Sequence, residues 1–181
     1  MTGVLGSSPS CASRSAKIVV VFDELLEANR TAAEGFDLAG VPPVAARGFA
    51  LVTCMDTRIE PLAMLGLRPG DAKILRNAGG RVTPDVLRSL VLATWLLQVR
   101  AVAVMQHTEC GLAGVTDEEL RRLTGSDLGF LPIDDHAAAL REDIEVLAAT
   151  PYLHSLRAIA GFVYDVETGQ LDDVARWERE G

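Results

Sequence analysis

Two cysteines and one histidine carry the clearest chemical signal in the sequence. Cys54 stands alone, whereas His107 and Cys110 are three residues apart and can face one ion from a single turn. Two thiolates and one imidazole leave one position of a tetrahedral Zn²⁺ open, as in catalytic rather than structural zinc sites. The three residues therefore predict one catalytic Zn²⁺ that activates a water molecule. Their spacing fits equally well two buried cysteines that act as small apolar groups and one hydrogen-bonded histidine.

Asp56 and Arg58 alternate with Cys54 in the segment Cys-Met-Asp-Thr-Arg. A carboxylate two residues from a thiolate ligand can reach the metal or the water on it. An arginine two residues further on can hold that carboxylate through two parallel hydrogen bonds. We therefore expect Asp56 to orient the water and Arg58 to hold Asp56. The alternative for this pair is an ordinary surface ion pair.

Short apolar runs lead directly to the proposed ligands. Residues 49–53 precede Cys54, and residues 102–105 are followed closely by His107. Each run is typical of a buried parallel strand. In open α/β sheets, binding sites collect beyond the carboxyl ends of the strands. We therefore expect Cys54, His107 and Cys110 to meet at one edge of the sheet.

The rest of the chain alternates strands with helices and predicts one α/β domain over residues 16–181. The expected architecture is a mostly parallel central sheet of about four to five strands flanked by helices. Residues 1–15 are small and polar and are expected to be disordered, so Cys11 is interpreted as incidental. Thr168-Gly169 is interpreted as a turn into a polar tail. Further strands are predicted at residues 73–76 and 159–166, and helices at residues 18–36, 83–98, 117–123 and 134–148.

Composition limits the kinds of partner. The 17 basic and 25 acidic side chains give a net charge of −8, which argues against binding to nucleic acid or to an anionic membrane. No apolar stretch approaches the ~20 residues of a membrane span. Three cysteines are too few, and odd in number, for a disulfide scaffold. We therefore expect a cytoplasmic protein with reduced thiols.

Three motifs occur in a fixed order: CMDTR at residues 54–58, RNAGG at residues 76–80 and HTECG at residues 107–111. Together they closely resemble the β-class carbonic anhydrases, in the compact form typical of an actinobacterial-type branch. The resemblance extends from about residue 22 to residue 173 and includes GFVYDVETG at residues 161–169. It implies a carbonate dehydratase, a zinc lyase that reversibly hydrates CO₂ to bicarbonate and a proton.

The resemblance also implies a role for each matching residue. Cys54, His107 and Cys110 correspond to the zinc ligands. Asp56 and Arg58 correspond to a catalytic dyad, in which Asp56 can also turn onto the metal as an alternate ligand. Residues of the two glycine-containing motifs are expected near the substrate; they are Arg76, Gly79, Gly80 and Gly111.

Several alternatives stay open. The family assembles as a homodimer or a dimer of dimers, with an N-terminal helix on the partner subunit, but residues 18–36 can instead pack on their own domain. Carbonyl sulfide is nearly isosteric with CO₂, so a carbonyl sulfide hydrolase would use the same residues. A non-catalytic, zinc-stabilised dimeric binding protein is the third possibility. His136 and His154 are candidates for a proton shuttle by residue type only.

Overall fold

The computed structural model describes residues 22–179, which fall in two units, Met1–Ala39 and Gly40–Gly181. The first unit contributes one described element, the helix α1 (Phe22–Ala33), in which no residue is buried. Asp23 and Glu24 lie in its first turn and Arg30 in its last, as the helix dipole favours. The predicted helix is thus present over these residues. Residues 18–21 and the tail expected over 1–15 lie outside the described residues.

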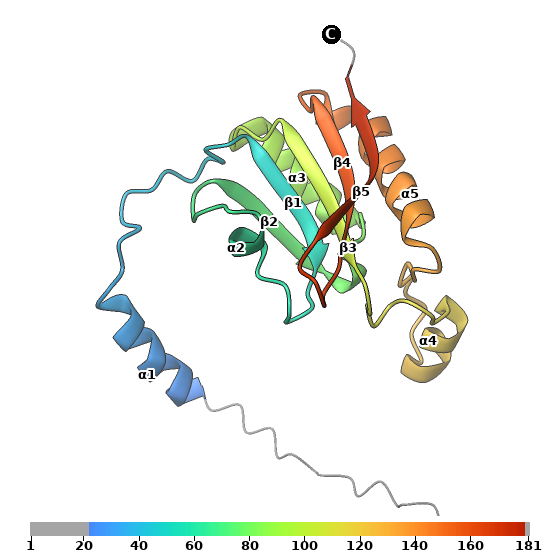
Figure 1. Cartoon of the computed structure of the whole chain (residues 1–181), viewed down its shortest axis with the longest axis horizontal. Helices are drawn as coiled ribbons and strands as arrows, with labels where there is room; N and C mark the ends of the chain where they lie inside the picture. Colours follow the sequence, from blue (N-terminus) through green and yellow to red (C-terminus); the bar gives the residue numbers. More distant parts are fainter. Residues whose placement is uncertain (1–21, 180–181) are drawn as a thin grey trace, which may run out of the picture. The chain divides into compact units, whose positions relative to one another are not determined.

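The second unit is built on one five-stranded sheet with strand order β2-β1-β3-β4-β5 (Figure 1). The first four strands are parallel, and β5 runs antiparallel to β4. This confirms the predicted α/β fold with a mostly parallel sheet. The strands are β1 (Phe49–Cys54), β2 (Ala72–Asn77), β3 (Ala101–His107), β4 (Ala158–Tyr164) and β5 (Leu171–Glu178).

The interpretation of the residues after Gly169 as a polar tail is wrong, because they form β5. Gly169 has a φ of 74° and allows the chain to turn back beside β4. β5 is an edge strand paired on one side only, so charged side chains along it do not disrupt the sheet. Such a strand lacks the continuous apolar run that identifies a buried strand.

Clear capping residues mark where two of the helices begin. Thr83 caps α3 by accepting a hydrogen bond from the Val86 amide, and Pro84 occupies the first turn of the helix predicted over residues 83–98. Thr116 and Glu119 form a reciprocal capping box on α4. The helices are α2 (Pro61–Met64), α3 (Pro84–Leu96), α4 (Asp117–Thr124) and α5 (His136–Ala149), and two short 3₁₀ turns cover Ala78–Gly80 and Pro151–Leu153.

The two faces of the sheet differ in what they pack against. On one face, alternate residues of β1 and β3, such as Val52 and Val104, contact buried side chains of α3 and α5. On the other face, Leu51 and Met105 belong to a second apolar cluster that contains Cys54 and Cys110. The proposed ligands therefore lie over a buried, apolar floor at the carboxyl end of the sheet.

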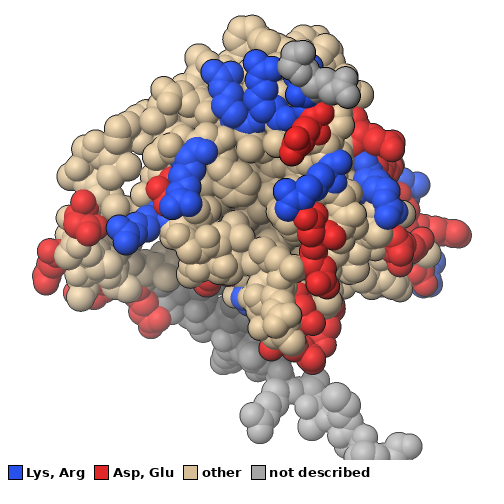
Figure 2. All heavy atoms as spheres, turned by 45° about the horizontal axis from the view of Figure 1, so that its top comes forward, with Lys and Arg blue, Asp and Glu red and all other residues tan. Residues whose placement is uncertain are grey.

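Charged side chains of both signs lie on the surface of the described residues. Figure 2 shows one face of the molecule, on which acidic side chains lie among the basic ones. Within residues 22–179, no helix combines the length and apolar character needed to cross a membrane.

Candidate metal centre

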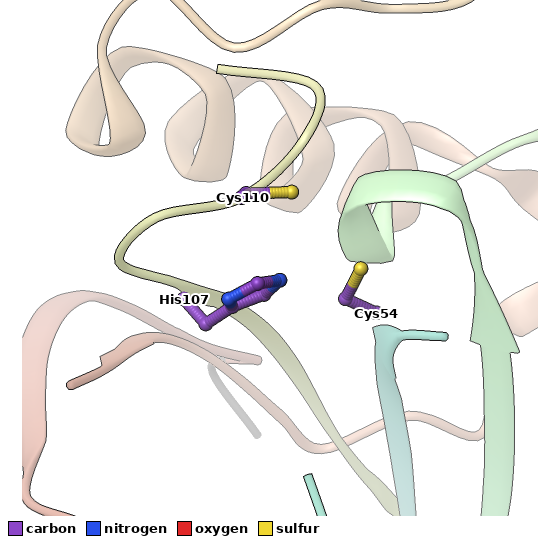
Figure 3. Close-up of side chains that lie close together, drawn as sticks. All are labelled: Cys54, His107 and Cys110. Atoms are coloured by element: carbon purple, nitrogen blue, oxygen red, sulfur yellow. The ribbon is translucent and has the colours of Figure 1, made fainter. Parts of the chain in front are cut away.

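Cys54, His107 and Cys110 converge at the carboxyl edge of the sheet (Figure 3). Cys54 ends β1, His107 ends the neighbouring parallel strand β3, and Cys110 lies in the loop that follows β3. All three are buried, and one ligand atom from each lies within 4.8 Å of the others. The predicted juxtaposition is therefore present.

His107 presents one ring nitrogen to this cluster in the form that binds a metal. Its Nδ1 lies 2.8 Å from the carbonyl oxygen of Thr108, which only accepts hydrogen bonds, so Nδ1 carries the proton. Nε2 is then left with a lone pair, and it is fully buried with no hydrogen-bond partner. Thr108 is itself held to β4, because its amide donates to the carbonyl of Tyr164 at 3.0 Å. The hydrogen bond to Thr108, on the side of the ring away from the cluster, thus fixes the orientation of the His107 imidazole.

The donor set fits Zn²⁺. Cys54 and Cys110 are free thiols. Burial raises the pKa of the Cys110 thiol, and the neighbouring Cys54 adds to that rise. Two buried thiolates side by side repel each other, whereas a soft divalent cation would stabilise both of them and would also accept the lone pair of the His107 imidazole. The chemistry of the three donors favours Zn²⁺ over a hard cation.

Asp56 and Arg58 form a close pair beside the ligands. The Asp56 carboxylate accepts from Nε of Arg58 at 3.0 Å, from Nη2 at 2.9 Å and from the Arg58 amide at 2.9 Å. These hydrogen bonds hold the pKa of Asp56 well below its usual range, so the carboxylate is ionised. Its Oδ2 atom lies 3.8 Å from Nε2 of His107. The pair is therefore part of the cluster and not an isolated surface contact.

Arg58 also contacts the loop between the two proposed ligands of the third motif, His107 and Cys110. Its Nη1 donates to Oε2 of Glu109 at 2.7 Å, and Nη2 donates to the Glu109 carbonyl at 3.2 Å. Glu109 has a φ of 56°, an uncommon conformation for a residue other than glycine. Arg58 thus connects the loop that carries Asp56 to the loop that carries Cys110.

The four residues expected near the substrate separate into two pairs. Gly79 and Gly111 line a pocket of about 400 Å³ that also includes Cys54, Asp56 and Cys110. The other two lie outside this lining. Arg76 donates to the carbonyls of Cys54 at 3.0 Å and Asp56 at 2.6 Å, and Gly80 packs against the backbone of β1 and β3.

Neither candidate proton shuttle lines this pocket. The half-buried His136 has Nδ1 2.8 Å from Oε1 of Gln106. His154 is exposed and lies edge-on to Trp95. Residue type alone was the basis for both candidates, and the structure gives neither a contact with the ligands.

Sequence reasoning missed one buried charged pair behind the site, formed by Arg81 and Asp143. Arg81 directly follows the RNAGG motif. Asp143 interrupts the apolar stripe of α5 at a position where Leu140, Ile144 and Leu147 are buried. A charged residue on the apolar face of a helix indicates a buried partner, and this signal could have identified the pair.

Comparisons with known proteins agree with this geometry. Residues 49–128 match the family model described as carbonic anhydrase. The chain is 33% identical to Beta-carbonic anhydrase 1 of Mycobacterium tuberculosis over 162 residues, which cover 86% of this chain and 99% of that protein. It is 32% identical to a carbon disulfide hydrolase of Saccharolobus solfataricus, over 74% of this chain and 79% of that protein.

Solved structures show the same relationship. The crystal structure of the carbonic anhydrase from Streptococcus mutans superimposes with a TM-score of 0.77 at 40% sequence identity. The match covers 85% of this chain and 97% of that chain. The sequence similarity extends over nearly the whole length of a relative, and the fold and the arrangement of the three donors agree with it. The chain belongs to the β-carbonic anhydrase family.

Proposed function

We propose that the chain is a zinc-dependent carbonate dehydratase that reversibly hydrates CO₂ to bicarbonate and a proton. One observation carries this proposal: the buried, unpartnered Nε2 of His107 faces two free thiols, beside a carboxylate that Arg58 keeps ionised. Zn²⁺ bound there would supply the Lewis acidity that makes water a nucleophile near neutral pH. Family membership and the donor set both support zinc as the cofactor.

Cys54, His107 and Cys110 are the proposed zinc ligands, and Asp56 and Arg58 the catalytic dyad. Asp56 is a pure acceptor because it is ionised, so it takes a hydrogen bond from the attacking water and fixes the direction of its lone pair. Arg58 holds both carboxylate oxygens. Since Asp56 lies only 3.8 Å from Nε2 of His107, a small rotation would also let it act as an alternate ligand and close the site.

The pocket beside the ligands suits a small, linear, apolar molecule. Met55, Ala78 and Leu112 contribute apolar surface to it, next to Gly79 and Gly111. Nothing lies within 4 Å of where a side chain at Gly111 would begin, so this glycine keeps space open beside Cys110. We assign Gly79 and Gly111 to direct substrate contact. We assign Arg76 and Gly80 a supporting role instead, because Arg76 donates to the backbone carbonyls of Cys54 and Asp56 and Gly80 packs against the backbone of β1 and β3.

A sulfur-containing analogue is the second candidate substrate. The carbon disulfide hydrolase of Saccharolobus solfataricus is nearly as similar in sequence as the mycobacterial carbonic anhydrase. That match, however, covers 79% of the hydrolase, against 99% of the carbonic anhydrase. CO₂ is therefore the preferred substrate, and hydrolysis of carbonyl sulfide is the alternative activity to test.

The proposed assembly is a homodimer or a dimer of dimers. α1 has no buried residue, although Phe22, Leu25 and Leu26 are large apolar side chains. A helix with this composition is expected to bury its apolar face against a partner. A reducing compartment such as the cytoplasm suits the site, because oxidation of Cys54 and Cys110 to a disulfide would remove two ligands.

The decisive experiment is a stopped-flow assay of CO₂ hydration and carbonyl sulfide hydrolysis on protein of measured zinc content. The proposal expects one zinc per chain and faster turnover of CO₂. Full zinc content with no turnover of either gas at alkaline pH would instead indicate the non-catalytic zinc-stabilised protein. Faster turnover of carbonyl sulfide would make the chain a hydrolase on the same scaffold.

A further inference from the structure

We infer that Arg81 is a positioning residue for the metal centre, joining the backbone behind Cys54 to the segment that supports the Cys110 loop. This inference rests on the zinc site proposed above. Arg81 follows the RNAGG motif, touches none of the three ligands and does not line the pocket beside them. Its contacts nevertheless reach towards both sides of the cluster.

The guanidinium of Arg81 is buried and anchored on α5. Only 3% of the side chain is exposed, the same fraction as for Asp143. Nε donates to Oδ2 of Asp143 at 2.8 Å, and Nη2 donates to Glu142 at 2.8 Å. Asp143 also accepts from the Val82 amide through its other oxygen, at 3.1 Å. Both carboxylate oxygens of Asp143 therefore hold the chain at the end of the glycine motif.

The backbone of Arg81 closes the loop that packs on Cys54. The Asn77 side chain donates to the Arg81 carbonyl at 2.8 Å and accepts from the Arg81 amide at 3.0 Å. Gly80 lies inside this closed loop. A Cβ there would be 2.7 Å from the Met105 carbonyl oxygen and 3.0 Å from the Cys54 nitrogen. The loop is thus in backbone contact with the residue that provides the first ligand.

The guanidinium also reaches the opposite side of the site. Nη1 donates to the carbonyl of Leu131 at 3.0 Å, with the Pro132 carbonyl at 3.4 Å. Leu131 has a φ of 55°, a conformation that persists only where the surroundings hold it. Two residues further on, the Ile133 amide donates to the Leu112 carbonyl at 3.1 Å, and Ile133 forms a parallel bridge with Ala113.

That bridge leads directly to the third ligand. The Ala113 amide donates to the Cys110 carbonyl at 2.9 Å, so the segment after Cys110 is a closed turn. Ile133 is buried, and its Cδ1 atom would lie 3.3 Å from a Cβ at Gly79. Arg81 therefore fixes the segment that packs between the Cys110 loop and the glycine motif.

The energetics of a buried ion pair support a positioning role. Burial raises the pKa of the Asp143 carboxyl against the opposing pull of Arg81, so desolvation of this pair is substantial. Well-packed apolar residues in place of a buried ion pair often leave stability unchanged or raise it. What an apolar pair cannot reproduce is the planar fork of donors that reaches α5 and two backbone carbonyls at once.

The test uses a double variant, Arg81→Met with Asp143→Leu, which removes both buried charges; Glu142, the other partner of Arg81, stays largely exposed to solvent. We expect a midpoint of denaturant unfolding close to that of the wild type. We also expect zinc to pass to a chromophoric chelator with an affinity loss of about 10- to 100-fold. The thiolate-to-metal absorption bands of the cobalt-substituted protein should shift, because the positions of Cys54 and Cys110 relative to each other change. A purely structural pair would not move these bands.

The single variant Arg81→Lys keeps a cation opposite Asp143 but lacks the fork, and we expect a smaller loss of zinc affinity in the same direction. Arg88→Met is the matched control, because Arg88 binds Asp85 in an exposed pair and should leave zinc affinity unchanged. Wild-type zinc affinity and cobalt spectrum in a folded double variant would overturn the inference. If the double variant does not fold, wild-type values in Arg81→Lys would overturn it. A wild-type protein that binds no zinc would reject the zinc site itself.

Discussion

Arg58 holds Asp56 by both carboxylate oxygens, with Nε 3.0 Å from Oδ1 and Nη2 2.9 Å from Oδ2. This two-point contact fixes the plane of the carboxylate as well as its position. It also keeps Oδ2 3.8 Å from Nε2 of His107, which is outside hydrogen-bonding distance. In the function proposed above, this contact would both orient Asp56 towards the metal-bound water and keep it from becoming a ligand.

Arg58→Lys is predicted to lower kcat/KM for CO₂ hydration on the order of 100-fold without loss of zinc. Lysine keeps the positive charge but provides a single point of contact, so Asp56 is free to rotate towards the metal. Stopped-flow kinetics and zinc content check this prediction. Arg88→Lys is the control, since Arg88 also uses Nε and Nη2 to bind an aspartate, but on an exposed surface. Near wild-type kcat/KM in Arg58→Lys would show that activity does not require the two-point contact between Arg58 and Asp56.

Cys110→Ser is predicted to lose most of its zinc on dialysis against a chelator, and activity with it. A serine hydroxyl is a harder and far less acidic donor than a thiol, so two of the three donors remain. The measurement is zinc per chain together with the free thiol count. Cys11→Ser should keep full zinc, as expected for a cysteine interpreted as incidental. A Cys110→Ser protein with full zinc and full activity would rule out this ligand assignment.

Gly80→Ala is predicted to destabilise the protein by at least about 2 kcal/mol. Its φ of 66° already disfavours a side chain, and the new Cβ would meet backbone atoms of Met105 and Cys54 that cannot move aside. Gly114→Ala separates the two effects, because Gly114 has a φ of 74° but open space around it. We expect Gly114→Ala to lose only about 1 kcal/mol in denaturant unfolding. Equal losses in the two variants would mean that the close approach at Gly80 is unimportant.

The sequence was most informative where chemistry and periodicity coincide. Cys54 and His107 each end a short apolar run, and neighbouring parallel strands end at the same edge of a sheet, so their meeting could be predicted. Every predicted element of the second unit lies within two residues of the bounds found. β5 was missed because an edge strand can carry charged residues that resemble a loop.

The supporting contacts of the site were harder to predict. Arg81 and Asp143 are 62 residues apart, and their contact depends on how α5 packs against the loop after β2. The pairing of Arg58 with Glu109 depends on a left-handed backbone conformation at Glu109, which residue type alone does not indicate. Motifs thus identified the residues that converge at the carboxyl edge of the sheet, whereas the residues that hold them in place emerged only from packing.

His136 gives the protein a titrating group whose effect on stability has a definite sign. Burial, and secondarily His107, lowers the pKa of His136 below its usual 6.5. As pH falls from about 6.5, the unfolded chain therefore takes up a proton before the folded protein does. Stability is lost over this interval and is fully present above it. The half-buried ring is partly screened by solvent, so the effect should be small.

His136→Gln is predicted to reduce the loss of unfolding free energy between about pH 7 and pH 5.5. Glutamine keeps an amide donor for Oε1 of Gln106, so the hydrogen bond at 2.8 Å in the wild type has a substitute. Acid release of zinc affects wild type and variant alike, so the difference between their denaturation curves isolates the ring. His154→Gln is the control, because it makes the same substitution at an exposed ring. If both variants follow the wild-type curve, His136 titrates equally in the folded and unfolded protein, and the burial of its ring has no energetic consequence.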